Sequence, residues 1–286
     1  MIASIRKTYR KYIHLPWLDN QIYKVLDLAT DFYAWTMGYH FPKSFIHRRW
    51  KLDLINNIYE KETVAIFKKI IKPGMTVLDI GAHIGFFTRL FSKLAGKNGK
   101  VLAIEADPEN FSFLEKNTKK LNNVQKFFVA ANDKIGAIDF FHCPEKSGCH
   151  STLVNIPLNF KTEKISVPAT DLDSLLFKQG ITKIDVIKMD IEGGEVAALA
   201  GMKQLLANSP NLTMITEFAP DWIVAAGQTP LDFLKNLTNL GFKIFAIVGD
   251  KLIPISSNFE ESYLKILPKP NANDSYNSFL NLYCIK

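Results

Sequence analysis

From about residue 60 onward, short apolar runs alternate with stretches in which apolar residues recur every three or four positions. The runs have the length of strands, and the longer stretches have the period of helices. Several runs are apolar almost throughout, as expected for strands covered by helices on both faces. The pattern predicts a doubly wound parallel α/β sheet. Strands are expected at 76–81, 100–106, 126–131, 185–191, 212–218, 242–248 and 279–286, and helices at 60–72, 85–96, 108–121, 170–180, 194–208 and 229–241.

The first 58 residues show helical periodicity without strand alternation, so we expect a helical extension at 1–58 and the α/β domain at 59–286. Near its start the chain mixes basic and aromatic side chains, in "IRKTYRKYIHLPW". Two interpretations stay open. The segment lies on an anionic membrane surface, or it is a terminal helix that packs its aromatic side chains on the main domain.

Two stretches interrupt the alternation, at 134–167 and at 256–277. The first contains an expected strand, "AIDFFH", followed by the loop "CPEKSGCHSTLVN". Both are expected to lie over the carboxyl edge of the sheet, where loops build the binding sites of open α/β proteins.

Composition narrows the class of protein. A hydrophobic fraction of 47% and a charged fraction of 22% suit a globular protein with a sizeable core. The net charge of +7 comes mainly from lysine, with only five arginines, and arginine is the better side chain for phosphate and guanine contacts. Nucleic acid is therefore an unfavoured partner. Three cysteines, no signal-peptide pattern and no apolar run of about 18 residues predict a cytoplasmic protein with at most peripheral membrane contact.

The first expected strand leads into a glycine turn, "VLDIGAHIGFF". Dinucleotide sites use Gly-x-Gly-x-x-Gly, so that a pyrophosphate can sit on the helix N-terminus. Here Asp79 stands two residues before Gly81, and Gly85 follows after three more positions. A carboxylate at that point suits a ligand that carries an amino group and is a poor neighbour for a pyrophosphate. Ala82 and His83 lie within the turn and are expected to contact the same ligand.

The second expected strand ends at Glu105, which can accept hydrogen bonds from both hydroxyls of a ribose. Ala106 follows it, and Asn132, after the third strand, is placed where an adenine edge would lie. These features together fit S-adenosylmethionine. The structural alternatives are that Asp79 caps the turn, that Glu105 is a solvated strand end, and that Asn132 forms an Asx-turn.

The fourth expected strand ends in "VIKMDIEGGE". Its carboxyl end should border the crevice beside the first strand, which places Asp190 and Glu192 at the mouth of the site. Methyl transfer to a hydroxyl requires an aligned nucleophile and a base that removes its proton, so either carboxylate is a candidate base. Glu195 has the simpler alternative of occupying the first turn of the next helix.

Two groups of residues contain possible metal ligands. Asp190 and Glu217 could converge on one Mg²⁺, but no third ligand is evident and the metal stays unassigned. The segment "HCPEKSGCH" offers His142, Cys143, Cys149 and His150, but the Cys-x5-Cys spacing lies outside the usual range for zinc and no second ligand pair follows. A loop that covers the site is preferred there, with His150 as a second candidate for the base.

Several ordered motifs together resemble the FkbM family of S-adenosylmethionine-dependent methyltransferases. They are "PGMTVLDIGAHIGFFT", "VLAIEADPENFSFLEKN", "SGCHSTLVN", "VPATDLDSLL" and "IDVIKMDIEGGEVAALAGM", and they span the chain from about Tyr59 to the end. The resemblance implies a seven-stranded methyltransferase fold with an antiparallel last strand, and O-methylation of sugars, glycans or secondary metabolites. His83 departs from the small residue, often Asn, that the family has in its glycine loop.

Three functions therefore follow as expectations. The first is S-adenosylmethionine-dependent O-methylation of a hydroxyl on a sugar, glycan or small metabolite. The second is a non-catalytic module that docks on membrane or an acidic partner. The third, least favoured, is RNA methylation. The sequence indicates neither the acceptor nor the oligomeric state.

Overall fold

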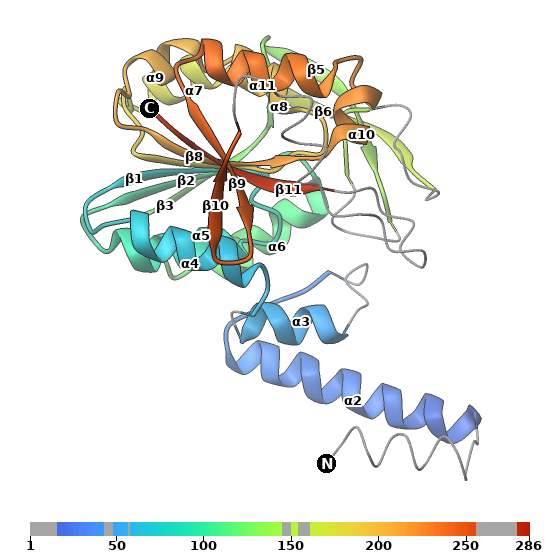
Figure 1. Ribbon diagram of the computed structural model, residues 1–286. Helices are drawn as coiled ribbons and strands as arrows, with labels where there is room; N and C mark the ends of the chain where they lie inside the picture. The colour runs from blue at the N-terminus through green and yellow to red at the C-terminus, as the bar shows by residue number, and fades with distance from the viewer. Residues whose placement is uncertain (1–15, 43–47, 57, 145–149, 154–160, 256–278) are drawn as a thin grey trace.

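The computed structural model describes residues 16–42, 48–56, 58–144, 150–153, 161–255 and 279–286. Within them the main sheet has eight strands in the order β10-β9-β11-β8-β7-β1-β2-β3 (Figure 1). Their bounds are β1 (Thr76–Ile80), β2 (Lys100–Glu105), β3 (Val124–Phe128), β7 (Val186–Met189), β8 (Thr213–Phe218), β9 (Lys243–Val248), β10 (Lys251–Pro254) and β11 (Leu280–Ile285).

The sheet confirms the doubly wound fold and its antiparallel last strand. The neighbouring strands from β3 through β8 are parallel, and β11 runs antiparallel to both β8 and β9, between which it lies. The eighth strand, β10, was not expected. It pairs antiparallel with β9 through a tight turn, in which Gly249 has a φ of 59°. A four-residue edge strand is too short to give a clear alternation in the sequence.

Helices cover both faces of this sheet (Figure 1). One face carries α4 (Lys61–Ile70), α5 (Phe86–Ala95) and α6 (Pro108–Thr118); the other carries α7 (Leu172–Lys178), α8 (Glu195–Ala200), α9 (Lys203–Ala207) and α11 (Pro230–Asn239). Alternate residues of β1 enter different cores: Leu78 and Ile80 pack with α7 to α11, whereas Val77 packs with α4 and α5. This alternation decides where Asp79 points.

Two expected elements are divided in the structure. The expected strand at 126–131 ends at Phe128, and β4 (Ala130–Ala131) joins a separate three-stranded sheet with β5 (Gly136–His142) and β6 (Glu163–Thr170). The expected helix at 194–208 breaks at Gly201, where a Cβ would lie 1.9 Å from the carbonyl oxygen of Asn132. The short helix α10 (Pro220–Ala225), after β8, was not predicted.

The N-terminal extension consists of α2 (Pro16–Thr36) and α3 (Arg48–Ile55), and its described residues contain no strand. The segment after α2 is fastened to the domain by Arg89 of α5. Its guanidinium donates to the carbonyl oxygens of Met37 and Gly38 at 3.0 and 2.6 Å and lies over the Tyr39 ring. Lys51 of α3 pairs with Asp31 of α2 at 2.6 Å. Most of the basic segment at 5–17 lies outside the described residues. No helix in the described part of the chain is long and apolar enough to cross a membrane.

Candidate active site

A cavity of about 550 Å³ opens at the carboxyl ends of β1, β2, β7 and β8. This is the edge at which the strand order reverses, between β1 and β7. Of the expected site residues, the cavity is lined by Gly81, Ala82, His83, Glu105, Ala106, His150, Asp190 and Glu192; Asp79, Gly85 and Asn132 do not line it. Other described segments that line it include α3 and the start of α10.

Glu105 lies at the end of β2 and presents a buried carboxylate to the cavity. Its two oxygens accept backbone N–H groups, Oε1 from Asp107 at 2.8 Å and Oε2 from His83 at 2.7 Å. These bonds fix the carboxylate in one orientation. Burial raises the pKa of Glu105 to about 7, with the charge of Asp107 adding to the effect and the backbone donors opposing it. Glu105 is therefore buried rather than a solvated strand end.

Asp79 is fully buried and points to the α5 face of the sheet, as the alternation in β1 requires. Its Oδ2 accepts the Thr88 hydroxyl at 2.5 Å, and its Oδ1 has no hydrogen-bond partner among the described residues. Burial raises its pKa, although the ammonium of Lys188 on the neighbouring strand opposes the shift. The carboxylate thus lies behind the cavity wall, next to the charged residues that reach the cavity.

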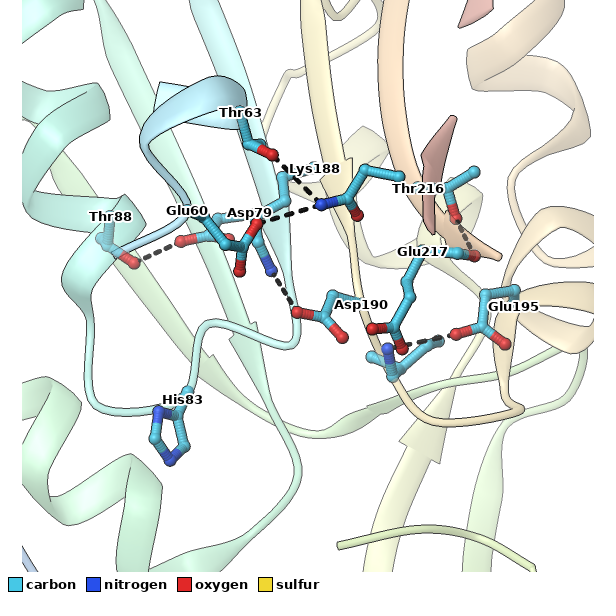
Figure 2. Close-up of polar contacts among 12 residues, drawn as sticks. Glu60, Thr63, Asp79, His83, Thr88, Lys188, Asp190, Glu195, Thr216 and Glu217 are labelled. Atoms are coloured by element: carbon cyan, nitrogen blue, oxygen red, sulfur yellow. Dashed lines mark hydrogen bonds and ion pairs between the residues drawn. The ribbon is translucent and has the colours of Figure 1, made fainter. Parts of the chain in front are cut away.

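The glycine turn after β1 packs directly against the loop after β7. Gly81 has a φ of 78°, and a Cβ there would lie 1.9 Å from the carbonyl oxygen of Asp190, so this position requires glycine. Gly85 serves packing instead, because a Cβ there would meet the Leu114 side chain of α6 at 2.9 Å. His83 occupies the left-handed region, with a φ of 53°, and lines the cavity. Its ring lies away from Asp190 and Glu217 in Figure 2. Left-handed backbone at a non-glycine residue often marks a functional site.

Small and apolar residues line the cavity beside Glu105. They are Ala106, Val129, Ala130, Ala131 and Phe140. Asn132 follows Ala131 in the chain, and its side-chain oxygen accepts the backbone N–H of the next residue, Asp133, at 2.7 Å. An Asx-turn accepts from the residue two positions on, so this contact is not the Asx-turn that the sequence left open. Asn132 does not line the cavity, so its contact with an adenine edge stays a prediction.

The opposite end of the cavity is rich in carboxylates. Oxygens of Asp190, Glu192 and Glu217 all lie within 4.8 Å of one another, and Asp190 and Glu217 face each other in Figure 2. The Lys188 ammonium donates to Asp190 at 2.9 Å. Burial lowers the pKa of Lys188, but the carboxylates of Asp190, Asp79 and Glu60 outweigh burial and raise it, so the residue stays cationic.

Two glutamates of this region differ in what they can do. Glu195 turns its carboxylate back to accept the Ile191 backbone N–H at 3.2 Å, so it closes the loop and does not line the cavity. Glu217 lines the cavity, and its pKa is raised by burial and by the charges of Asp190 and Glu192. A carboxylate with a raised pKa is suited to accept a proton near neutral pH.

The end of β5 and the segment after it bring two histidines to Asp107. Nδ1 of His142 lies 2.5 Å from Asp107 Oδ2, and the rings of His142 and His150 are stacked with centroids 4.7 Å apart. These three residues could each offer one atom to a metal ion, but the sulfur of Cys143 is not part of that group. Cys149 lies outside the described residues.

Sequence reasoning missed several residues that shape the site. Lys188 had a signal, since residues two apart in a strand share a face and Lys188 precedes Asp190 by two. No pattern pointed to Glu60, at the start of α4, or to the aromatic residues contributed by distant segments. Those that line the acidic end are Trp50, Tyr59, Trp222 and Phe279.

The residues present fit a nucleoside with an attached sulfonium. A buried carboxylate lines the cavity at the end of β2, and apolar residues lie beside it. The carboxylates of the acidic end line the same cavity. The strand order with an antiparallel last strand is that expected of a methyltransferase.

Comparison with known proteins specifies the family. Residues 79–244 match the model of the methyltransferase FkbM domain, so the chain belongs to the FkbM methyltransferase family. It is 30% identical over 178 residues to the 2-O-methyltransferase NoeI of Sinorhizobium fredii, a match that covers 58% of this chain and 72% of that protein. It is 32% identical over 88 residues to ribosomal RNA large subunit methyltransferase E of Bdellovibrio bacteriovorus, covering 28% of this chain and 45% of that one.

Among solved structures, a putative O-methyltransferase from Klebsiella pneumoniae aligns with 99% of this chain and 96% of its own, at 12% identity and a TM-score of 0.46. Aeropyrum pernix fibrillarin, solved with S-adenosyl-L-methionine, aligns with 79% of this chain and 76% of its own, at 12% identity and a TM-score of 0.44. These likenesses are distant, and the strand order itself defines the fold.

Proposed function

We propose that this FkbM methyltransferase uses S-adenosylmethionine to methylate a hydroxyl of a sugar, glycan or small metabolite. The observation that carries the proposal is the division of one cavity into two chemically different ends. One end has the buried Glu105 carboxylate beside apolar residues, and the other has Asp190, Glu192 and Glu217 among aromatic side chains.

The nucleoside end would hold the cofactor. Glu105 would accept hydrogen bonds from ribose hydroxyls, and the alanines and Phe140 would enclose the adenine. The turn from Gly81 to His83 would lie along the remainder of the molecule. When bound there, S-adenosylmethionine supplies a methyl group on a positively charged sulfur, which nearby carboxylates stabilise electrostatically.

The acidic end suits a hydroxylated acceptor. Carboxylates accept hydrogen bonds from hydroxyl groups, and the flat faces of Trp50, Tyr59 and Trp222 suit the C–H faces of a sugar ring. Oxygen as the methylated atom is supported by the name of the relative NoeI, a 2-O-methyltransferase. Several carboxylates at the cavity would repel the phosphates of RNA.

The transfer requires that one bond form as another breaks. With S-adenosylmethionine bound, the acceptor oxygen would bond to the methyl carbon while the carbon–sulfur bond breaks, and the electron pair of that bond would stay on sulfur to give the neutral thioether. The acceptor proton passes to a carboxylate of the acidic end. Lys188 cannot take it, because the residue is held protonated by the surrounding carboxylates.

The test is transfer of label from methyl-labelled S-adenosylmethionine to a panel of saccharides, small hydroxylated metabolites and RNA. We expect labelled saccharide or metabolite with the wild-type protein, and loss of label with Asp190→Asn while S-adenosylhomocysteine still binds. Label in RNA alone would overturn the choice of acceptor. Failure of the wild-type protein to bind S-adenosylhomocysteine would overturn the function and favour a non-catalytic module.

A further inference from the structure

His150 is held in an orientation that fixes which of its ring nitrogens carries the proton. The backbone N–H of Cys143 donates to its Nδ1 at 2.9 Å. An N–H donor needs a lone pair on the atom it contacts, so Nδ1 is unprotonated. In a neutral imidazole the proton then lies on Nε2.

The nearest carboxylate does not reverse this assignment. Oδ2 of Asp107 lies 3.7 Å from Nδ1 of His150, beyond hydrogen-bond distance, and the same oxygen contacts Nδ1 of His142 at 2.5 Å. The Asp107 carboxylate is therefore the hydrogen-bond partner of His142 and not of His150. Burial lowers the pKa of His150 to about 4, with the neighbouring His142 and His83 adding to the effect and Asp107 opposing it. The ring is neutral at pH 7.

The Nε2 side of the ring lacks a partner. The His150 side chain is 5% exposed, its Nε2 has no hydrogen-bond partner in the described part of the chain, and the residue lines the cavity. A buried N–H without a partner costs about 1–3 kcal/mol, so the fold gains when a bound molecule offers a lone pair there.

Asp107 links this donor to the nucleoside end. Its backbone N–H donates to Oε1 of Glu105, and its carboxylate lies beside both histidines. Phe140, which lines the apolar part of the cavity, lies next to His150 with ring centroids 6.4 Å apart.

We propose that His150 donates its Nε2–H to a lone pair of the bound nucleoside, a ring nitrogen of adenine or an oxygen of ribose. The inference rests on the proposed use of S-adenosylmethionine. It makes His150 a ligand-binding donor, and it removes His150 from the candidate bases, because the ring nitrogen that has no partner already carries its proton.

Two substitutions of His150 test the roles of its two ring nitrogens one at a time. In His150→Gln the side-chain amide can place an N–H near the position of Nε2. In His150→Asn the shorter side chain can place an oxygen near Nδ1, where it accepts from Cys143, but it offers no donor at Nε2. Calorimetry with S-adenosylhomocysteine and the full-length chain should show His150→Gln within about 3-fold of wild type. His150→Asn should be weaker by about 5-fold to 150-fold, the equivalent of one lost hydrogen bond.

A purely structural role would lower the melting temperature of both variants and leave their affinities alike, which would overturn the proposal. Nitrogen-15 NMR of the wild-type protein at pH 7 reports which ring nitrogen of His150 carries the proton, without any substitution. We expect a neutral ring protonated at Nε2 whose signal moves when S-adenosylhomocysteine is added; protonation at Nδ1 overturns the assignment. Equal binding by wild type and His150→Asn would remove this role and leave the proposed function intact.

An independent feature, the outer face of α2, carries a second inference. Thr30 and Ala34 of this helix are buried, whereas a broad opposite face is apolar and exposed. At 100° per residue the exposed apolar side chains cover about half of the circumference. They are Ile22, Val25, Leu26, Leu28, Phe32, Tyr33 and Trp35.

The charge of the neighbouring sequence indicates what covers this face. Residues 1–15 contain four Lys or Arg residues and neither Asp nor Glu. A second copy of the chain docked through α2 would bring two such segments together, which like charges disfavour. An anionic lipid surface accepts both the apolar face and the positive charge. We infer that α2 lies on the surface of a membrane that contains anionic lipid.

Vesicle flotation of the full-length protein tests this inference. Binding is expected to phosphatidylcholine vesicles that contain phosphatidylserine, with loss at high salt and loss in Phe32→Ser/Trp35→Ser. Val224→Ser is the matched control, since Val224 is an exposed apolar residue of α10. Equal binding to vesicles of phosphatidylcholine alone would overturn the role of charge. Absence of flotation would overturn the inference, and dimerisation in sedimentation that the double substitution abolishes would assign the face to a second copy.

Discussion

Gly81 and the carbonyl oxygen of Asp190 are so close that a Cβ on Gly81 would lie 1.9 Å from that oxygen. The contact joins the loop that would hold the cofactor to the loop that carries the candidate base. Because backbone lies against backbone, there is no room for a side chain between the two loops.

Gly81→Ala should therefore lower both stability and ligand affinity. Left-handed backbone alone costs an alanine about 1–2 kcal/mol, and the clash adds to this. Gly227→Ala is the control, because Gly227 has a φ of 76° but open space within 4 Å of a Cβ. Thermal unfolding and calorimetry with S-adenosylhomocysteine should show a larger loss for Gly81→Ala. Similar results for the two variants would contradict the clash.

Lys188→Met should be strongly destabilising. It leaves the buried carboxylate of Asp79 and the half-buried carboxylate of Asp190 without their cation. Breaking a fully buried pair costs about 3–5 kcal/mol, and the exposure of Asp190 places this loss toward the lower end. Urea unfolding measures the loss. Lys164→Met is the control, since Lys164 and Asp139 form an exposed pair at 2.8 Å with side chains 60% and 58% exposed, and such pairs contribute about 0–1 kcal/mol. Adding Asp79→Asn should recover part of the Lys188→Met loss.

Affinity for S-adenosylhomocysteine should rise with pH through the pKa of Glu105, about 7. Ribose hydroxyls donate to the ionised carboxylate, so protein protonated at Glu105 must first lose that proton to bind. Between pH 6 and pH 8 the wild-type affinity should increase several-fold. Glu105→Gln should bind weakly with little pH dependence. A wild-type profile as flat as that of the variant would show that Glu105 does not receive the ribose.

Two carboxylates of the acidic end, Asp190 and Glu217, should both contribute to turnover. Positioned proton transfer contributes about 10²- to 10⁴-fold. Asp190→Asn and Glu217→Gln should each lower kcat by about 100-fold or more, and Glu217→Gln should remove the rise of rate with pH that its raised pKa predicts. Glu195→Gln is the control, because that carboxylate accepts from Ile191 and does not line the cavity. Unchanged kcat in Glu217→Gln would exclude its role.

Chelation distinguishes proton transfer from metal binding at the same oxygens. The grouping of Asp190, Glu192 and Glu217 within 4.8 Å supplies the third ligand that the sequence did not show. We expect methyl transfer to persist in EDTA, because Lys188 already neutralises Asp190. Loss of activity in EDTA with recovery on adding Mg²⁺ would assign these carboxylates to a metal.

Much of the fold followed from hydrophobic periodicity, because buried parallel strands and amphipathic helices both leave long patterns. The glycine turn and Glu105 were also readable, since their positions at strand ends limit what they can contact. The direction of the Asp79 side chain was harder to predict. Its position before the glycine turn predicted a carboxylate in the cavity, but the alternation of β1 turns that carboxylate toward Thr88 and α5. That distinction depends on which face of the strand each core covers.

Other features depend on contacts between segments far apart in the chain. The tautomer of His150 is set by a backbone group seven residues away, in a loop without regular periodicity. The aromatic residues of the acidic end come from α3, the segment just before α4, α10 and the residue before β11, which no local pattern connects.

Trp50 and Leu54 of α3 line the cavity although they precede the matched family domain, which begins at residue 79. The wall around the proposed acceptor site is therefore built in part by residues that lie outside the matched domain. Relatives could exchange this leading segment and come to modify different molecules, while the machinery for the methyl donor stayed the same.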